Sequence, residues 1–337
     1  MGSRRGPGWQ PVSARELRAL PKAHLHLHLE AAIRPATLAE LTERHGLEWV
    51  VPPFTDFSIF STTYRTLLAV LSMPENLARL IDETVADGAV DGAVYLELSV
   101  VPNFYADVFG TAREALRFHL EVARAAAERH GVEVGLAIGI DRTLPLEQAI
   151  DDARLAAEFA GEGVVALGLA NDERGYPVAD FAPAFRIAAD AGLLVTPHAG
   201  ELCGPDEVRA AVEVCEADRV LHGVRAIEDP AVVALLAQRG VPLDVCPTSN
   251  VLLGVAASLA EHPLPALLKA GVRCSINADD PILFGPGLLD EYETARAGIG
   301  LSDEQLAACA LTSIETSGAS QKVKQRGAAG VAAWLAA

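Results

Sequence analysis

The stretch Ala23–Glu30, AHLHLHLE, decides the fold and carries the first chemical signal of the chain. Leucines alternate with polar residues, which is the period of a β-strand whose two faces meet different surroundings. The polar positions of this strand are His24, His26, His28 and Glu30. Burying so many polar groups on one apolar strand is unfavourable without a partner, and a metal ion such as zinc is the natural partner for imidazoles. We therefore predict a buried strand at which a metal site begins.

Outward from this stretch, short apolar runs alternate with alanine-rich helical patterns over almost the whole chain. Helical spacing is clear over Thr111–His130, Leu146–Ala160 and Glu207–Cys215. An unbroken alternation of strand and helix predicts a parallel sheet, and eight units favour a closed (β/α)8 barrel of the TIM type, an α/β fold, over an open sheet. Besides the first, the predicted strands are Ala93–Val100, Val132–Asp141, Val164–Asn171, Leu193–His198, Arg219–His222, Val241–Cys246 and Arg273–Asp279.

The barrel is predicted to be a single domain over residues 20–337, because no linker rich in Pro, Gly or Ser divides the chain. Residues 1–19 are predicted to be a flexible tail, since their start is rich in Arg, Gly and Pro and lacks the apolar core of a signal peptide. The stretch Pro52–Met73 is longer than a barrel loop requires, and we predict a helical lid inserted after strand one. Extra packing outside the barrel is the alternative. The aromatic residues of this stretch are Phe54, Phe57, Phe60 and Tyr64.

Composition limits the partners. The 337 residues include 27 Lys and Arg against 45 Asp and Glu, a formal net charge of −18. An acidic surface repels phosphate backbones, which argues against a nucleic-acid polymer as partner. No apolar run approaches the roughly 18 residues of a membrane span. The five cysteines form no CxxC pair, as is typical of reduced thiols in a cytoplasmic protein. We predict a cytoplasmic protein with a small-molecule partner, and the oligomeric state is left open.

Three further motifs follow the predicted strands five, six and eight. TPHAGE places His198 at a strand end with Glu201 after a turn, and VLHG ends the next strand with His222. INADDP places Asp279 and Asp280 after strand eight. Because the carboxyl ends of barrel strands meet at one mouth, these residues are predicted to converge with the first-strand histidines. Imidazoles, carboxylates and a free acid are the inventory of a hydrolytic metal site.

In this order the motifs resemble the adenosine deaminase family of the amidohydrolase superfamily. The resemblance implies a barrel with one zinc ion per chain that hydrolyses the 6-amino group of a purine nucleoside, giving the 6-oxo product and ammonia. The matching pieces, over roughly residues 20 to 320, are PKAHLHLHLEAAIRPATL from Pro21, LGLANDE from Leu167, HAGE from His198, LHG from Leu221, CPTSN from Cys246 and INADDP from Ile276.

The resemblance also implies a role for each matching residue. Glu201 would protonate the ring nitrogen beside the reacting carbon, and His222 would orient the attacking hydroxide. Asp280 would contact the imidazole edge of the purine, and Glu30 would lie near the sugar end of the substrate. His24 would be a supporting or structural residue. The zinc ligands would be His26, His28, His198 and Asp279.

Three positions depart from the family's pattern. Ala31 replaces a glycine after the first acid, Asn171 replaces a glycine in the LxGDE segment, and Ser99 replaces an arginine. The expected substrate is therefore adenosine or a modified adenosine, with aminodeoxyfutalosine or free adenine as alternatives. Asn171 is expected to bind the substrate, because its amide needs a hydrogen-bond partner that an extra polar group on the substrate would supply.

Other functions fit less well. A general amidohydrolase that cleaves a cyclic amide or ester often uses two metals and a lysine late on strand four, where this chain reads LGLAND. The HxE and PCxxC signature of the cytidine deaminases is absent. A barrel that only binds a purine or a metal has no need of a proton-carrying residue such as Glu201. The sequence therefore predicts a zinc-dependent deaminase.

Overall fold

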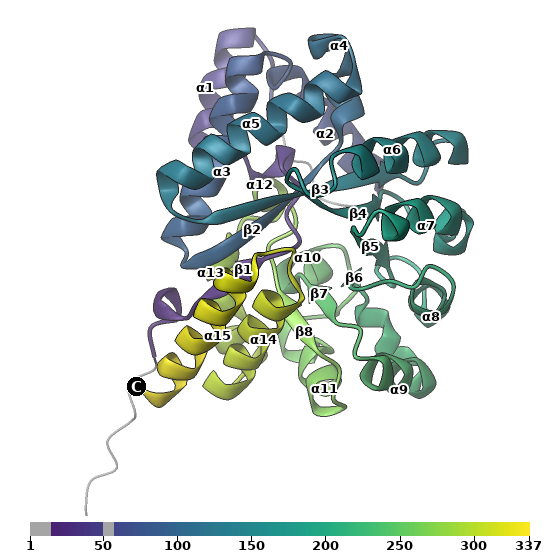
Figure 1. Ribbon diagram of the computed structural model, residues 1–337. Helices are drawn as coiled ribbons and strands as arrows, with labels where there is room; N and C mark the ends of the chain where they lie inside the picture. Colours follow the sequence, from purple (N-terminus) through teal and green to yellow (C-terminus); the bar gives the residue numbers. More distant parts are fainter. Residues whose placement is uncertain (1–14, 50–56) are drawn as a thin grey trace, which may run out of the picture.

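A computed structural model describes residues 15–49 and 57–337, and its strands form one eight-stranded parallel sheet in the order of the sequence (Figure 1). The order β1 to β8, with each strand beside the next along the chain, is that of a (β/α)8 barrel. The strands are β1 Lys22–His24, β2 Ala93–Val100, β3 Glu133–Asp141, β4 Val164–Ala170, β5 Leu194–Ala199, β6 Val220–His222, β7 Leu243–Val245 and β8 Cys274–Ile276.

Helices separate the strands and surround the sheet (Figure 1). Those between β1 and β5 are α1 Pro35–His45, α2 Phe57–Val70, α3 Pro74–Val90, α4 Ala106–Phe109, α5 Ala112–His130, α6 Leu146–Glu158 and α7 Ala182–Asp190. Those after β5 are α8 Pro205–Glu213, α9 Pro230–Arg239, α10 Pro247–Leu252, α11 Leu264–Lys269, α12 Pro281–Phe284, α13 Leu288–Thr294, α14 Asp303–Thr316 and α15 Gln321–Ala336. Short 3₁₀ or π turns are η1 Leu17–Ala19, η2 Glu30–Ala32, η3 Pro102–Tyr105, η4 Val178–Phe181, η5 Val224–Glu228, η6 Leu259–Glu261 and η7 Ala295–Ile299.

The barrel closes between the segments that follow β1 and β8. Leu27 forms a parallel bridge with Asp279. The His28 N–H donates to the Asp279 carbonyl at 3.0 Å, and the Asp279 N–H donates to the His26 carbonyl at 3.1 Å. These bonds bring the first-strand histidines beside the aspartate of the last strand. The prediction of a single (β/α)8 barrel is confirmed.

The predicted strands agree with the structure to within three residues at each end, except in the first strand. The prediction Ala23–Glu30 was wrong beyond His24, where β1 ends. The next two N–H groups, of Leu25 and His26, donate to the side-chain Oδ1 of Asn277 at 2.7 and 3.1 Å instead of joining a ladder. Glu30 lies in the 3₁₀ turn η2. Hydrogen bonds to the side chain of Asn277, just after β8, therefore replace the regular strand in which the histidines were expected.

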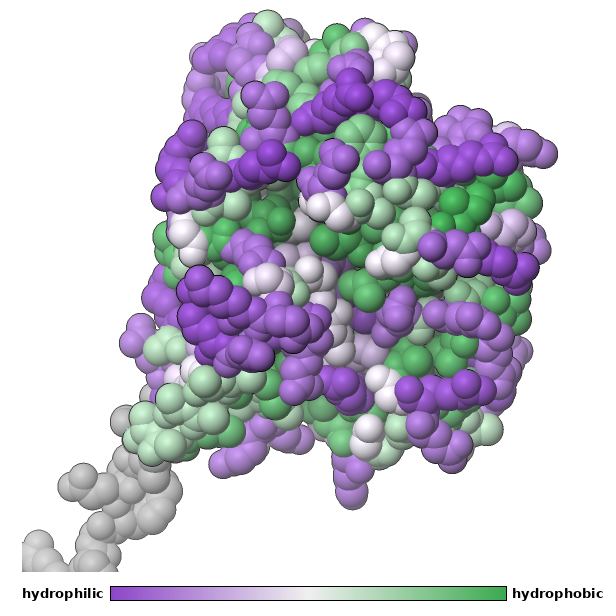
Figure 2. Space-filling view, in the orientation of Figure 1, coloured by the Kyte–Doolittle hydropathy of each residue, from purple (hydrophilic) through white to green (hydrophobic). Residues whose placement is uncertain are grey.

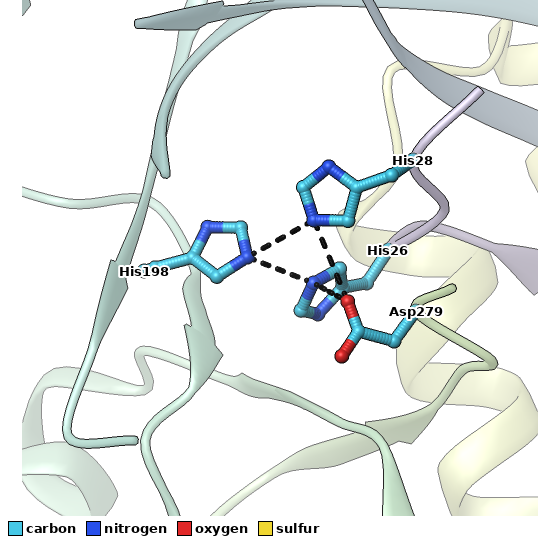
Figure 3. A group of neighbouring side chains, drawn as sticks. All are labelled: His26, His28, His198 and Asp279. Carbon is cyan, nitrogen blue, oxygen red and sulfur yellow. Dashed lines mark hydrogen bonds and ion pairs between the residues drawn. The ribbon is translucent and has the colours of Figure 1, made fainter. Parts of the chain in front are cut away.

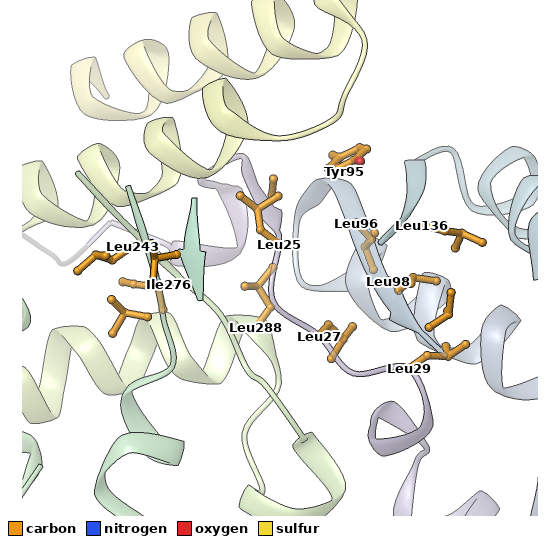
Figure 4. Packing of buried hydrophobic residues seen from close by; sticks show 14 of the residues in the cluster. Leu25, Leu27, Leu29, Tyr95, Leu96, Leu98, Leu136, Leu243, Ile276 and Leu288 are labelled. Carbon is orange, nitrogen blue, oxygen red and sulfur yellow. The ribbon is translucent and has the colours of Figure 1, made fainter. Parts of the chain in front are cut away.

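The interior of the barrel combines apolar packing with one buried charge network. Leucines of the first-strand segment pack against those of neighbouring strands (Figure 4). Arg219, which precedes β6, is fully buried and forms ion pairs with Glu97 of β2 and with Asp244 of β7, the latter at 2.8 Å. Ser275 of β8 donates to the other oxygen of Asp244 at 2.6 Å. Each buried charge thus has a partner, which a buried ion requires.

Residues 15–19, which the sequence analysis assigned to a flexible tail, pack on the barrel. Leu17 in η1 is fully buried in the core, and the Arg15 guanidinium forms an ion pair with Asp303 at 3.0 Å. Residues 15–19 therefore belong to the barrel domain, because the apolar residues of this segment pack on it. Residues 1–14 lie outside the described part of the chain.

The predicted lid contains α2. Tyr64 of this helix is described, whereas Phe54 and the side chains of Phe57 and Phe60 lie outside the described part of the chain. A helix inserted between β1 and β2 is confirmed, and its closure over the barrel stays a prediction.

Hydrophilic and apolar residues alternate on the visible outer surface (Figure 2). On the face shown in Figure 2, hydrophilic residues spread over the outer helices, and apolar residues form smaller patches between them. Within residues 15–49 and 57–337, no helix has the length and apolar character needed to span a membrane.

Candidate functional site

Four side chains from separate parts of the sequence converge at the carboxyl ends of the strands (Figure 3). The Nε2 atom of His198, on β5, is 3.0 Å from Nε2 of His26 and 3.3 Å from Nε2 of His28. The Oδ1 atom of Asp279, after β8, is 3.1 Å from His26 Nε2 and 3.4 Å from His28 Nε2. In a tetrahedral zinc site with bonds of about 2.0–2.1 Å, ligand atoms are about 3.3–3.4 Å apart. The observed spacing fits one such ion.

The protonation of these imidazoles also fits a metal site. The Nδ1 atom of His198 is 2.8 Å from the Leu169 carbonyl, which only accepts, so Nδ1 carries the proton and Nε2 directs its lone pair inward. Burial lowers the pKa of His28 to about 4, and burial together with the neighbouring histidines holds the pKa of His198 well below its usual range. Neutral imidazole lone pairs and a carboxylate repel one another when they share one centre, and a bound cation removes that repulsion.

Residues around the cluster hold its members in place. The Ser249 hydroxyl donates to Oδ2 of Asp279 at 2.7 Å, which leaves Oδ1 directed at the histidines. His24 accepts a hydrogen bond from the Ala278 N–H at 3.2 Å, one residue before Asp279. The predicted supporting position of His24 agrees with this contact. Outer partners of this kind orient metal ligands and tune them.

Backbone strain gathers at the same place. Among the described residues, four that are not glycine have a positive φ, and three of them surround the cavity: Asn171 at 81°, His222 at 59° and Asp279 at 63°. Such conformations are unfavourable for most residues and concentrate at functional sites.

His222 lies beside the cluster in a defined orientation. Its Nε2 is 3.4 Å from Glu201 Oε1 and 3.8 Å from Asp279 Oδ2. Its Nδ1 is 3.2 Å from the amide nitrogen of Asn250, whose oxygen is 3.3 Å from His262 Nε2. An amide nitrogen only donates, so His222 Nδ1 is the acceptor and Nε2 carries the hydrogen. That hydrogen faces the two carboxyl groups. Sequence reasoning missed Asn250 and His262, although the CPTSN motif was the signal for the first.

Glu201 lines the same cavity. Its side chain is buried, and burial, with the charges of Asp279 and Glu173, holds the pKa of Glu201 well above its usual range. The preceding Gly200 has φ 71°, and a Cβ there would lie 2.2 Å from Val208 Cγ2. Only glycine therefore permits the tight turn between His198 and this acid.

Glu173, which sequence reasoning also missed, anchors the loop that carries Glu201. One carboxylate oxygen of Glu173 accepts hydrogen bonds from the N–H groups of Glu201, Leu202 and Cys203 at 3.2, 2.7 and 2.6 Å. Its other oxygen is 3.8 Å from the fully buried guanidinium of Arg142, which donates to the His198 carbonyl at 3.2 Å. The LANDE motif contained this residue, but only the tertiary structure brings it under the loop.

Replacing Glu173 by Ala is expected to lower the free energy of unfolding by about 3 kcal/mol, because three loop N–H groups lose their acceptor. Urea denaturation measures this change. Glu173→Gln keeps a carbonyl oxygen and should recover part of the loss, whereas equal stability of the alanine variant and the wild type would exclude an anchoring role.

A cavity of about 340 Å³ opens onto the cluster. Its polar wall contains His28, His198, Glu201, His222, Asp279 and Asp280, and its apolar wall contains Leu68, Val101, Phe104, Ile140, Leu253 and Phe284. Ligand pockets are commonly of this size and this mixed character. Tyr64, Arg65 and Leu68 of α2 reach the cavity, so the inserted helix forms part of its wall.

Asp280 faces the cavity beside the cluster. Its carboxyl group is buried, and its Oδ1 has no hydrogen-bond partner among the described residues. Burial and the adjacent Asp279 hold the pKa of Asp280 well above its usual range. An unpartnered polar atom aimed at a cavity is expected to meet a ligand.

Glu30 lies behind the cavity wall. Its two carboxylate oxygens accept hydrogen bonds from the hydroxyls of Tyr64 and Tyr105, both at 3.0 Å. Glu30 is not among the residues that line the cavity, and Tyr64 is. Both oxygens of this carboxylate therefore already have partners within the protein. The predicted contact of Glu30 with a sugar stays a prediction.

The three departures from the family's pattern differ in position. Only Asn171 lines the cavity, whereas Ala31 is buried in η2 and Ser99 pairs through its backbone with the segment after β1. The reason for expecting Asn171 to contact the substrate, an amide without a partner in the protein, does not hold, and the contact itself stays a prediction. The amide nitrogen of Asn171 donates to Asp141 at 3.0 Å, and its oxygen accepts from the Asp172 N–H at 2.8 Å.

Two curated deaminases match this chain over nearly its whole length. A Streptomyces coelicolor protein provisionally named adenosine/adenine deaminase is 39% identical, over 96% of this chain and 99% of that protein. An aminodeoxyfutalosine deaminase of the same organism is 36% identical, over 97% of this chain and 89% of that protein.

Solved structures of deaminases and amidohydrolases share the fold of this chain over most of its length. Adenine deaminase from Arthrobacter aurescens superimposes with a TM-score of 0.86 at 29% identity, covering 94% of this chain and 99% of that one. A zinc-bound Burkholderia ambifaria amidohydrolase has a TM-score of 0.82 at 27% identity, and the match covers 95% of this chain and 91% of that one. Arabidopsis ADAL in complex with IMP has a TM-score of 0.84 at 25% identity, and the match covers 94% of this chain and 97% of that one.

The profile of the family described as adenosine deaminase matches residues 21–334. With this match over nearly the whole chain and the long matches to named relatives, the protein belongs to the adenosine deaminase family and is a hydrolase acting on the C–N bonds of cyclic amidines.

Proposed function

We propose that this protein deaminates a 6-aminopurine nucleoside. Water adds at C6, the bond between C6 and its amino nitrogen breaks, and the 6-oxo nucleoside and ammonia leave. One observation carries the proposal: Glu201, Asp280 and three members of the His/Asp cluster line the same cavity. A nucleophile, an acid and a ring-binding group are thus available to one small ligand.

The cluster suits one zinc ion per chain, held by His26, His28, His198 and Asp279. When bound, zinc would supply water activated for attack at neutral pH. The family is metal-dependent, and the zinc-bound relative of similar fold supports this choice. The same three-nitrogen, one-oxygen donor set also accepts iron, cobalt or manganese. A cytoplasmic location stays a prediction.

The remaining residues move or hold protons. An aromatic carbon that bears an amino group resists attack until the adjacent ring nitrogen is protonated, and the protonated Glu201 is the group that would supply that proton. The resulting carboxylate would then take a proton from the attacking water and pass one to the departing ammonia. The Nε2–H of His222 would orient the attacking oxygen, and Asp280 would hold the imidazole edge of the purine.

A second candidate substrate is an adenosine extended at its 5′ position. The lining of the cavity includes the apolar residues Leu68, Phe104 and Leu253, which would be available to pack on an extension. The aminodeoxyfutalosine deaminase among the relatives supports this candidate, and the adenine deaminase of similar fold supports free adenine.

Ammonia release from a substrate panel separates these possibilities. We expect the zinc-loaded protein to deaminate at least one of adenosine, 2′-deoxyadenosine, 5′-methylthioadenosine and aminodeoxyfutalosine with a kcat/KM about tenfold or more above that for adenine. A preference for adenine would overturn the choice of a nucleoside, and release of no ammonia from any of these purines would overturn the proposed function. If adenosine exceeds both extended nucleosides about tenfold, the 5′-extended candidate fails.

A further inference from the structure

Asp141, the last residue of β3, is a carboxylate on the cavity wall that the proposed chemistry leaves unused. Its Oδ1 accepts three hydrogen bonds: from the N–H and hydroxyl of Thr143 at 2.9 and 2.7 Å, and from the Asn171 amide at 3.0 Å. Its Oδ2 has no hydrogen-bond partner among the described residues. The carboxylate is therefore held by one oxygen and offers the other to the cavity.

Asn171 is itself fixed in the orientation that holds Asp141. Its φ of 81° places the backbone in the left-handed region, which asparagine tolerates better than most residues that carry a Cβ. Its amide oxygen accepts the Asp172 N–H, so the amide nitrogen is directed at Asp141. The pair lies on the part of the wall formed by β3 and β4, whereas the metal-binding group comes from the segments at β1, β5 and β8.

The chemistry of the substrate indicates what the exposed oxygen meets. A purine whose C6 faces the cluster, with Glu201 at the adjacent ring nitrogen N1 and Asp280 at N7 of the imidazole edge, turns its sugar-bearing nitrogen away from the cluster. The remaining wall then faces the sugar. A carboxylate oxygen accepts hydrogen bonds only, and sugar hydroxyls donate them.

We propose that Oδ2 of Asp141 accepts a hydrogen bond from a sugar hydroxyl and that this contact determines a preference for nucleosides over free bases. The inference rests on the proposed function and deepens it. An N–H of a free purine base is the other source of a donor, and the substrates below separate the two.

The test combines Asp141→Asn with sugar-modified substrates. For adenosine, kcat/KM is expected to fall about 10- to 100-fold, the usual effect of losing a hydrogen bond to a charged group. For adenine, and for whichever of 2′-deoxyadenosine, 3′-deoxyadenosine or 5′-deoxyadenosine lacks the recognised hydroxyl, it is expected to change less than about threefold. An equal fall for all substrates, or a fall confined to adenine, would overturn the proposal.

Two further variants guard against a misfolded or misplaced Asp141→Asn protein. Asn171→Gly keeps the left-handed backbone and removes one donor to Asp141, so it should give a smaller fall with the same dependence on the sugar. Asp172→Asn makes the matched change in a carboxylate that pairs with Arg174 and does not line the cavity, and kcat/KM should stay at the wild-type value. A fall in Asp172→Asn equal to that in Asp141→Asn would contradict a specific contact.

Binding of reaction products tests Asp141 independently of turnover. By titration calorimetry, inosine should bind the wild type about tenfold or more tightly than it binds Asp141→Asn, and hypoxanthine should bind both equally. Equal affinity of inosine for both proteins would overturn the role of Asp141 even if adenosine is deaminated. If no purine is turned over, the proposed function fails, and this difference in inosine affinity still decides the role of Asp141.

Discussion

Glu201→Gln is expected to lower kcat for the best purine substrate by about 10²–10⁴-fold, the usual contribution of a positioned acid–base group. Glutamine has nearly the same shape and keeps the hydrogen bonds of the loop backbone to Glu173. It has no acidic proton to give to the ring nitrogen. The loss should therefore be in the chemical step, and KM should change little.

The metal content of this variant separates loss of acid–base chemistry from loss of the site. Glu201 is not one of the four ligands of the proposed zinc site, so elemental analysis should find as much metal in Glu201→Gln as in the wild type. Glu213→Gln makes the same change on the exposed side of α8 and should leave kcat unaltered. Wild-type kcat in Glu201→Gln would remove this residue from the mechanism.

The barrel and the convergence of the site were predictable because both follow from local pattern and topology. His198, His222 and Asp279 each lie at or just after the end of a strand, and parallel strands place their carboxyl ends at one mouth. Position along the chain was therefore enough to bring them together. The two-residue spacing of His26 and His28 placed both beside them even though β1 ends earlier than expected.

The residues that sequence reasoning missed act through contacts between distant segments. Asn277, just after β8, interrupts the first strand, and Glu173 reaches the Glu201 loop from the segment after β4. Neither contact has a period or a spacing that a single sequence displays. Asn171 illustrates the same limit, because the partner of its amide is Asp141, thirty positions away in the chain. Buried polar groups find partners across the fold, and only the fold shows which.

Removing a metal ligand is expected to have an effect of similar size. His26→Ala should lose the metal and retain less than about 1% of the wild-type kcat/KM, because loss of an outer partner alone typically weakens metal binding about 10–100-fold. The wild type should keep about one equivalent of metal after dialysis against a weak chelator. Elemental analysis and ammonia release measure the two losses together.

A graded series distinguishes a metal site from a merely buried histidine cluster. Ser249→Ala removes only the hydrogen bond to Asp279 Oδ2, so metal affinity should fall about 10–100-fold while saturating metal restores activity. His130→Ala changes a histidine that pairs with Asp82 away from the cavity and should retain the full equivalent of metal. Two equivalents in the wild type, or a full equivalent in His26→Ala, would contradict the four-ligand site.

Thermal unfolding gives a readout that does not depend on turnover. The Nε2 atom of His28 lies 3.3 Å from Nε2 of His198 and 3.4 Å from Oδ1 of Asp279. Neutral imidazoles and a carboxylate at this spacing are stabilised by a cation, and removal of the cation leaves them repelling one another. A ligand that binds only the folded state raises its stability, so a strong chelator should lower the Tm of the wild type. It should leave the Tm of His26→Ala unchanged, because that protein has no bound metal to lose. An equal fall in both proteins would show that the chelator acts elsewhere on the chain.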